Sequence, residues 1–281
     1  MQINVFERGA DVFQSEQYNQ LTIYHANNLY REPGIVHGFS SRAGGFSKAP
    51  YQGLNLGLTS NDNIADVQKN RIAFADALGI LPEQVVSGFQ VHSTNIVGVI
   101  KEDSGKGFLS VETALPDTDG LVTNEHGIAL MTLYADCVPV LFYDAHAHVI
   151  AVCHCGWRGT VNRMAAKTAS VMIDEYGCHA EHILAAIGPS ISQQHYEVDD
   201  KVLTQFREAF SFADQLIQPT NDKHGKIDLW KANQLQLEEI GLLREHIEIS
   251  ELCTYQHVDK FYSHRAEHGI TGRNAALLML K

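Results

Sequence analysis

The sequence predicts a mixed fold of the α+β class, in which short strands and amphipathic helices alternate along one domain. Three short apolar runs bounded by turn residues are typical of buried strands, and they occupy residues 128–134, 138–143 and 149–153. Helical spacing of apolar residues, with capping residues and stop signals, predicts helices at 61–79, 161–176, 199–213 and 228–240. Because no repeat, low-complexity segment or long linker divides the 281 residues, we expect a single domain over 1–281.

Shorter strands complete the predicted sheets. A peripheral hairpin is expected around 21–25, and further strands at 34–39, 85–99 (a strand pair), 182–188, 250–254 and 275–280. Alternation would place Gln90 and His92 on one face of their strand. In the same way, Cys153 and Cys155 would share one face of the strand near 149–154, and His154 would lie on the other.

Composition limits the classes of partner. With 44% apolar and 19% charged residues and a net charge of −12, the chain is typical of a soluble protein with no basic stripe for nucleic acid. No uninterrupted apolar stretch reaches the roughly 18 residues of a membrane span. The N-terminus lacks the pattern of a secretory signal, and five irregularly spaced cysteines are typical of reduced thiols. We therefore expect a cytoplasmic protein with no membrane or nucleic-acid partner.

The best candidate ligand set for a metal ion is His92, Cys137 and His154, each at or near the end of a predicted core strand. Two imidazoles and one thiolate suit Zn²⁺, and three protein ligands leave a fourth position open, as in catalytic zinc sites. Asp136 or Gln90 could orient one of these ligands through a hydrogen bond to its side chain. Spacing alone is only moderately specific, because 15 histidines and five cysteines allow many triples.

Two glycine-bracketed segments are candidates for binding an anion. Gly44 and Gly45 follow Arg42, and glycines let the backbone approach a ligand while arginine offers a planar fork for phosphate. Asn55, between two leucines, must find a backbone or ligand partner. The turn at 156–159, with Arg158, directly precedes the predicted helix at 161–176, which Thr160 would cap. The free N–H groups at the start of that helix would favour negative charge.

Several sequence blocks, spread over nearly the whole chain, resemble the motifs of the YfiH family in the same order. They read GFQVHSTNIV, DGLVT, YADCVPVLFYD, HCGWRGT, GPSI and CTYQH…FYSHR…TGR, and the segments SSRAGG and LNLG are similar to that family too. The resemblance implies that the metal ligands are His92, Cys137 and His154. One departure is Cys155, where the family usually has alanine. We expect a layered α-β-β-α sandwich of mixed sheets flanked by helices.

Members of this family were first labelled laccase-like polyphenol oxidases and are now described as zinc-dependent purine nucleoside phosphorylases. The resemblance implies phosphorolysis of adenosine, inosine and methylthioadenosine to free base and ribose 1-phosphate, together with adenosine deamination. Phosphorolysis needs an anion held beside the sugar. From residue type and loop position, Arg42 and Arg158 are candidates for phosphate contact, with Arg273 as a third. The chain could act as a monomer or a homodimer.

Three alternatives stay open from the sequence. Cys137 with His92 or His154 could be the nucleophile and base of a hydrolase or amidase, which agrees with a peptidoglycan-editing role given to some family members. Copper-dependent phenol oxidation is the second, although a multicopper oxidase needs several His-x-His motifs and only 146–148 has that form. A non-enzymatic metal-binding domain is the third.

Overall fold

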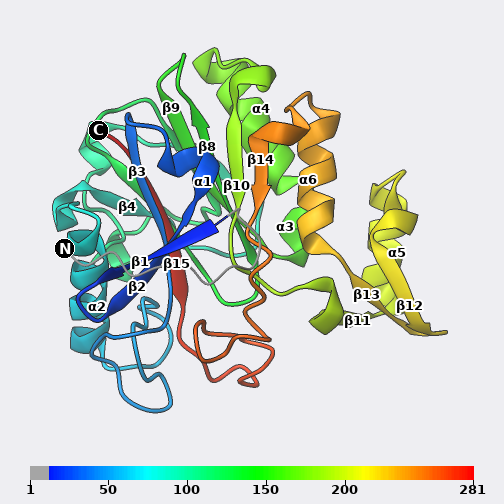
Figure 1. Cartoon of the computed structure of the whole chain (residues 1–281), viewed down its shortest axis with the longest axis horizontal. Helices are drawn as coiled ribbons and strands as arrows, with labels where there is room; N and C mark the ends of the chain where they lie inside the picture. The colour runs from blue at the N-terminus through cyan, green and yellow to red at the C-terminus, as the bar shows by residue number, and fades with distance from the viewer. Residues whose placement is uncertain (1–12) are drawn as a thin grey trace.

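The computed structural model describes residues 13–281 and confirms the layered α-β-β-α sandwich. Two six-stranded sheets pack face to face, and helices cover the outer face of each (Figure 1). The expected absence of a secretory signal falls mainly on residues 1–12, which lie outside the described range. Among residues 13–281, no helix combines the length and the hydrophobicity needed to cross a bilayer.

The first sheet has the strand order β1-β2-β3-β15-β7-β4. Its N-terminal hairpin is confirmed, because β1 and β2 pair antiparallel. The C-terminal strand β15 lies between β3 and β7, antiparallel to both, which ties the two ends of the described chain together. The strands are β1 (Phe13–Tyr18), β2 (Leu21–Ala26), β3 (Ile35–Ser40), β4 (Val85–Ser87), β7 (Ala129–Tyr134) and β15 (Asn274–Leu280).

The second sheet has the order β14-β10-β8-β9-β6-β5. At its centre, β8 and β9 form an antiparallel pair with every residue buried, as their continuous apolar runs predict. The strands are β5 (Ile96–Gly98), β6 (Gly120–Thr123), β8 (Val138–Asp144), β9 (Val149–Cys155), β10 (Leu184–Ile187) and β14 (Ile247–Ile249). The chain therefore crosses from one sheet to the other between β7 and β8, at residues 135–137.

Two strand predictions are wrong. The segment 85–99 is not a strand pair, because β4 and β5 belong to different sheets and residues 88–95 between them form a loop. The strand expected at 250–254 lies earlier, at β14, and Cys253 makes only an isolated bridge with Ser190. Between β4 and β5, the Phe89 N–H bonds to the loop residue Leu115, and within residues 250–254 only the Ser250 N–H still bonds to a strand residue, Ile187 of β10.

A small third sheet, β11-β13-β12, projects with α5 at one side of the molecule (Figure 1). Its strands are β11 (Glu197–Asp199), β12 (Ile217–Asn221) and β13 (His224–Ile227). The α-helices are α1 (Asn27–Tyr30), α2 (Ile64–Ala77), α3 (Trp157–Val161), α4 (Met164–Tyr176), α5 (Asp200–Ala209) and α6 (Leu229–Glu239). Single 3₁₀ turns occur at Pro82–Gln84, Lys101–Asp103, Val111–Thr113, Ala180–His182, Gln193–His195, Ala213–Gln215 and Arg244–His246.

The helix predicted at 161–176 is confirmed as α4, which begins at Met164, and a separate short helix comes before it. This short helix, α3, begins directly after β9, with Gly156 as its N-cap, so the segment 156–159 is its first turn and not a loop. Arg163 then adopts a left-handed conformation (φ 63°), which breaks the chain of helical hydrogen bonds before α4. The other predicted helices are confirmed with shorter ends, and α2 is capped by Asn63.

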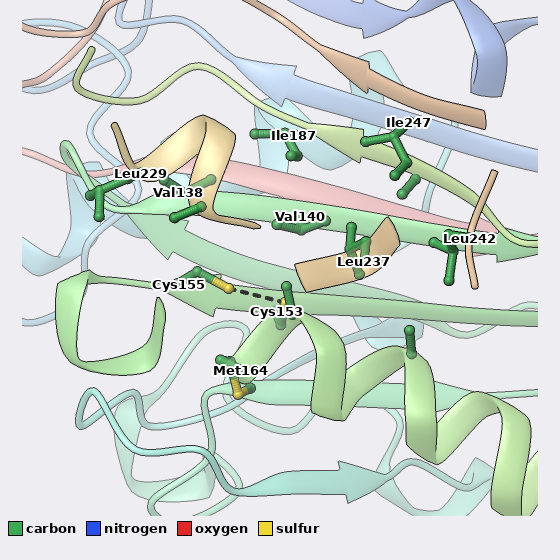
Figure 2. Packing of buried hydrophobic residues seen from close by; sticks show 14 of the residues in the cluster. Val138, Val140, Cys153, Cys155, Met164, Ile187, Leu229, Leu237, Leu242 and Ile247 are labelled. Carbon is green, nitrogen blue, oxygen red and sulfur yellow. Dashed lines mark hydrogen bonds between the residues drawn. The ribbon is translucent and has the colours of Figure 1, made fainter. Parts of the chain in front are cut away.

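Three apolar layers hold the sandwich together. Side chains such as Leu130, Tyr134 and Leu141 fill the space between the two large sheets. The outer face of the first sheet packs against α2, and that of the second packs against α4 and α6. Figure 2 shows this last layer, where Val140, Cys153 and Cys155 face Met164 and Leu237. Each large sheet thus packs one face against the other sheet and the other face against α-helices, while the edge strands β1 and β5 stay partly exposed.

Candidate metal centre

Three potential ligands, His92, Cys137 and His154, converge at one end of the sandwich. One donor atom from each lies within 4.8 Å of the others, and His92 Nε2 is 3.9 Å from Cys137 Sγ. Cys137 immediately precedes β8, and His154 is the next-to-last residue of β9, opposite Pro139. Because these strands are neighbours, two of the three donors sit on a rigid frame.

The third ligand comes from a loop. His92 does not lie on a strand, so the predicted face shared with Gln90 is wrong for this segment. Its backbone is in the left-handed region (φ 61°), and Asp136, just before Cys137, has φ 81°. Such conformations cost about 1–3 kcal/mol each for non-glycine residues and gather at functional sites. Both conformations must therefore be held by their surroundings.

Asp119 holds His92 and His154 in place. Its Oδ1 accepts hydrogen bonds from the His92 N–H (3.1 Å) and from His154 Nδ1 (2.9 Å). Its Oδ2 accepts from the N–H groups of Val91 and Ser93 and from the Ser93 hydroxyl. The bond to His154 places the proton on Nδ1 and leaves Nε2 to face Cys137. Asp119 is not among the site residues predicted from the sequence, although it is the first residue of the DGLVT block.

Gly156 leaves the space that the cluster occupies. A Cβ atom there would lie 2.9 Å from His92 Cδ2, closer than real Cβ contacts, and 3.1 Å from Cys137 Sγ, which is tighter than most of them. The backbone of Gly156 is extended (φ −66°), so its dihedral angles do not require glycine. We infer that the missing side chain serves the packing of the ligand cluster.

The charges in the cluster favour a thiolate. Burial alone would raise the pKa of the Cys137 thiol, but the positive charge of His154 and the hydrogen bonds from both histidines lower it to about 6. Burial opposes the charged form of His154, yet the charge of Cys137 and the bond to Asp119 raise its pKa to about 10. The thiolate is the form of cysteine that binds metals, and a bound cation would replace the proton between these groups.

Two nitrogens and one sulfur, with the space beside them kept open by Gly156, fit a metal ion that prefers mixed N and S ligands. The cluster opens into a cavity of about 470 Å³. Aromatic side chains and three arginines contribute to its wall, including Phe89, Tyr134, Trp157, Tyr196, Arg71, Arg265 and Arg273. An aromatic and cationic wall beside a metal site suits a flat ligand together with an anion.

Comparison with known proteins gives the family. Residues 36–281 match the family described as "Multi-copper polyphenol oxidoreductase laccase". The chain belongs to this family. It is 38% identical over 247 residues to the protein named purine nucleoside phosphorylase YlmD of Bacillus subtilis. The aligned region covers 88% of this chain and 89% of that protein.

Solved structures agree with this assignment. The crystal structure of YlmD from Geobacillus stearothermophilus superposes with a TM-score of 0.91 at 35% identity, over 97% of this chain and 100% of that one. The Bacillus licheniformis protein YfiH gives a TM-score of 0.91 at 31% identity with the same coverage. The resemblance to the YfiH family expected from the motifs is therefore confirmed.

In this laccase-like chain, the two residues predicted to orient ligands make other bonds. The Gln90 amide donates to Leu133 O (2.8 Å) and accepts from Leu133 N–H (2.7 Å), which fastens the loop of His92 to β7. Asp136 accepts hydrogen bonds from Thr254 Oγ1 and from the Arg265 N–H, each at 2.6 Å. Both residues hold the backbone near the ligands, and the direct contact to an imidazole comes from Asp119.

The three predicted phosphate-binding arginines lie in different surroundings. Arg42 pairs with Glu267 (3.1 Å) and stacks on Tyr262, so its charge is already balanced. Arg158 is exposed, and its guanidinium lies 4.5 Å from the Trp157 ring centroid. Arg273 forms part of the cavity wall, and its side-chain bonds go only to backbone carbonyls.

Asn55 is fully buried and has protein partners at both ends of its amide. Its Oδ1 accepts from the N–H groups of Gly57 and Arg273, and its Nδ2 donates to Ser60 Oγ and Asp62. The partner required by its burial is therefore the protein itself. Through the bond to Arg273, Asn55 positions an arginine of the cavity wall.

Cys153 and Cys155 face away from the ligand cluster, as alternation predicts. Both are fully buried in the layer under α4, where their sulfur atoms are 3.4 Å apart (Figure 2). Burial raises the pKa of Cys155 well above its usual value, so this thiol stays protonated and unreactive. The departure from the family pattern at Cys155 thus does not add a donor to the cluster.

Proposed function

We propose that this protein is a zinc-dependent purine nucleoside phosphorylase. The reaction converts adenosine, inosine or methylthioadenosine to the free base and ribose 1-phosphate, and adenosine deamination is a second activity of the same site. The observation that carries the proposal is the His92–Cys137–His154 cluster at the wall of a cavity with aromatic and cationic side chains. The names of the relatives support the same reaction.

The roles of the chain's residues follow from their positions. Zn²⁺, when held by His92, Cys137 and His154, supplies a Lewis acid at the cavity wall. Asp119 keeps the His154 proton on Nδ1, so that Nε2 stays available as a ligand atom. Phe89 and Trp157 supply aromatic surface to the cavity wall for a purine, and the cavity shields the sugar and base from bulk water.

Phosphate binding is assigned to Arg273. Among the three arginines considered from the sequence, it alone lies on the cavity wall. Arg42 is neutralised by Glu267, and Arg158 is exposed on α3. We infer that the guanidinium of Arg273 holds the anion beside the sugar, because charge-assisted bonds to phosphate are strong and directional.

A single zinc ion is favoured over a multicopper centre. Within residues 13–281, His92, Cys137 and His154 are the only group of three such side chains close enough to share an ion. The two imidazoles of the motif at 146–148 face different neighbours, since His146 stacks on His182 and His148 lies beside His126. Cu²⁺ could still occupy the cluster in place of Zn²⁺, since both accept imidazole.

A cysteine hydrolase or amidase is the second candidate, and one observation favours it. A thiol with a pKa of about 6, 3.9 Å from an imidazole nitrogen, is also what a catalytic nucleophile and base require. An amidase of peptidoglycan would survive chelation of metals but not alkylation of Cys137. The phosphorylase would lose activity in both treatments.

We also propose that the protein acts in the cytoplasm on small molecules, as a monomer or a homodimer. Its five free cysteines fit a reducing compartment.

The test is incubation of zinc-loaded protein with inosine or adenosine, with and without phosphate. Phosphorolysis predicts ribose 1-phosphate only when phosphate is present, and deamination predicts inosine from adenosine in either case. Absence of both products, with zinc bound, contradicts the proposal.

A further inference from the structure

Arg71 is a fully buried arginine that has no acidic partner. It lies on α2 and is 1% exposed. Its Nε donates to Leu56 O (2.6 Å), and its Nη1 donates to Gly107 O (2.8 Å) and Phe108 O (2.6 Å). The ion pairs that arginines form within residues 13–281 involve other side chains: Arg42, Arg163, Arg207 and Arg244.

One nitrogen of this guanidinium, Nη2, makes no hydrogen bond to the described part of the protein. Arginine carries five N–H groups, and the three hydrogen bonds to carbonyls occupy those of Nε and Nη1. The two N–H groups of Nη2 have no partner among the described residues. Nη2 is not enclosed by protein, because the fully enclosed polar side-chain atoms that lack a partner within residues 13–281 belong to other residues. Its N–H pair is therefore accessible to a ligand.

The open side of this guanidinium borders a cavity. Arg71 forms part of the wall of the same cavity as His92, Cys137 and Arg273. The fold has thus placed an uncompensated guanidinium at the edge of the space beside the metal ligands.

The balance of charge in the cavity is opposite to that of the whole protein. Arg71, Arg265 and Arg273 line it, against one carboxylate, Asp136, whose two oxygens are bonded to Thr254 and the Arg265 N–H. The chain as a whole carries −12. Such a local concentration of positive charge, with low-dielectric walls, favours an anion.

We propose that Nη2 of Arg71 is a donor in a subsite for a phosphate group within this cavity. Its three bonds to carbonyls fix the plane of the guanidinium, so that the remaining N–H pair is oriented before the ligand arrives. The identification of the ligand as the phosphate co-substrate rests on the proposed function. The same chemistry would accept the phosphate of a nucleoside 5′-monophosphate.

Burial lowers the pKa of Arg71 to about 9, which still leaves the side chain charged at neutral pH. At neutral pH the subsite is therefore positively charged, and phosphate is an anion there.

The experiment measures binding of inorganic phosphate, and separately of inosine 5′-monophosphate, to the zinc-loaded full chain by calorimetry. Loss of one charge-assisted hydrogen bond predicts that Arg71→Gln raises the Kd for the phosphate ligand about 10- to 100-fold. Binding of unphosphorylated inosine should change less than about threefold. The control is Arg207→Gln, because Arg207 is exposed on α5 and pairs only with Asp200.

Since Arg71 also ties loops together, Arg71→Gln could fail to fold, and two other variants keep the proposal testable. Arg71→Lys retains the charge but not the planar fork, and should still weaken phosphate binding several-fold. Thr59→Glu leaves Arg71 intact and adds a carboxylate at an exposed position on the same cavity wall. It should weaken phosphate binding relative to the isosteric Thr59→Gln.

The outcomes separate this inference from the proposed function. If phosphate binding depends on Arg71 but no phosphorolysis occurs, the subsite stands and the function is wrong. If phosphorolysis occurs and Arg71→Lys keeps the wild-type KM for phosphate, the subsite is wrong. Failure of the wild type to bind either phosphate ligand would also overturn it.

Discussion

The carboxylate of Asp119 and the imidazole of His154 form a 2.9 Å hydrogen bond that links the turn before β6 to the end of β9. The same carboxylate accepts the N–H of His92, so one side chain holds two of the three ligands. Although burial would raise the pKa of Asp119, the hydrogen bond and charge of His154 lower it. The ligand geometry therefore depends on an ionised residue that does not itself belong to the cluster.

The first prediction concerns this carboxylate. Asp119→Asn replaces one acceptor oxygen with an NH₂ group. The side chain can then no longer accept hydrogen bonds both from the N–H groups of the His92 loop and from the His154 imidazole. Loss of such an orienting partner weakens zinc binding by about 10- to 100-fold, which competition with a chromogenic chelator would measure. Asp117→Asn is the matched control, because Asp117 is exposed on the same turn and should leave zinc affinity unchanged.

The second prediction concerns the space at Gly156. Gly156→Ala puts a methyl group within 2.9 Å of the His92 ring and 3.1 Å of the Cys137 sulfur. The ligands must move apart, so zinc content and activity should fall at least about tenfold, since small misplacement of reacting groups is costly. Gly159→Ala, in the same helix but with no atom closer than 3.3 Å to the new Cβ, should keep both. Equal behaviour of the two variants would count against the inferred role of Gly156.

The third prediction concerns pH. In the metal-free protein, the pKa of Cys137 is lowered to about 6, so the thiolate persists down to that pH and is lost below it. Alkylation by iodoacetamide should therefore reach half its maximal rate near pH 6, instead of the roughly 8.5 of an ordinary thiol. Mass spectrometry should find a single fast site, because the other four cysteines are buried. Saturating zinc should protect that site, and a midpoint above pH 8 would disprove the assignment.

The fourth prediction separates the arginines. Arg273→Gln removes a charged donor from the cavity wall and should raise the KM for phosphate about 10- to 100-fold. Arg158→Gln should leave it unchanged, because Arg158 is exposed and contacts Trp157. Steady-state rates at varied phosphate and fixed inosine measure both. A larger effect at Arg158 than at Arg273 would reverse our assignment of the anion site.

The sequence predicted the parts of the site that depend on regular strands. Apolar runs located β8 and β9, and alternation correctly turned Cys153 and Cys155 away from His154. Such patterns depend only on residues that are close together in the chain. They can therefore be recognised without knowing the tertiary fold.

The parts that were missed depend on contacts between distant segments. The alternation of its neighbours predicts a strand at His92, but the N–H groups of 91–93 bond to the Asp119 carboxylate, 26–28 residues away. The sequence pattern predicts only that Arg71 lies in an amphipathic helix. The fold shows that its three carbonyl partners come from two loops. Nothing in the local pattern of either segment distinguishes these arrangements.

The central claim is that one zinc ion at His92, Cys137 and His154 supports phosphorolysis. Its most direct test is to titrate the metal-free protein with Zn²⁺ while measuring ribose 1-phosphate formed from inosine and phosphate. The account predicts activity that rises linearly and saturates at one zinc per chain, and no activity for Cys137→Ala at the same zinc concentrations. Full activity in the metal-free protein, or activity that does not follow zinc occupancy, would contradict it.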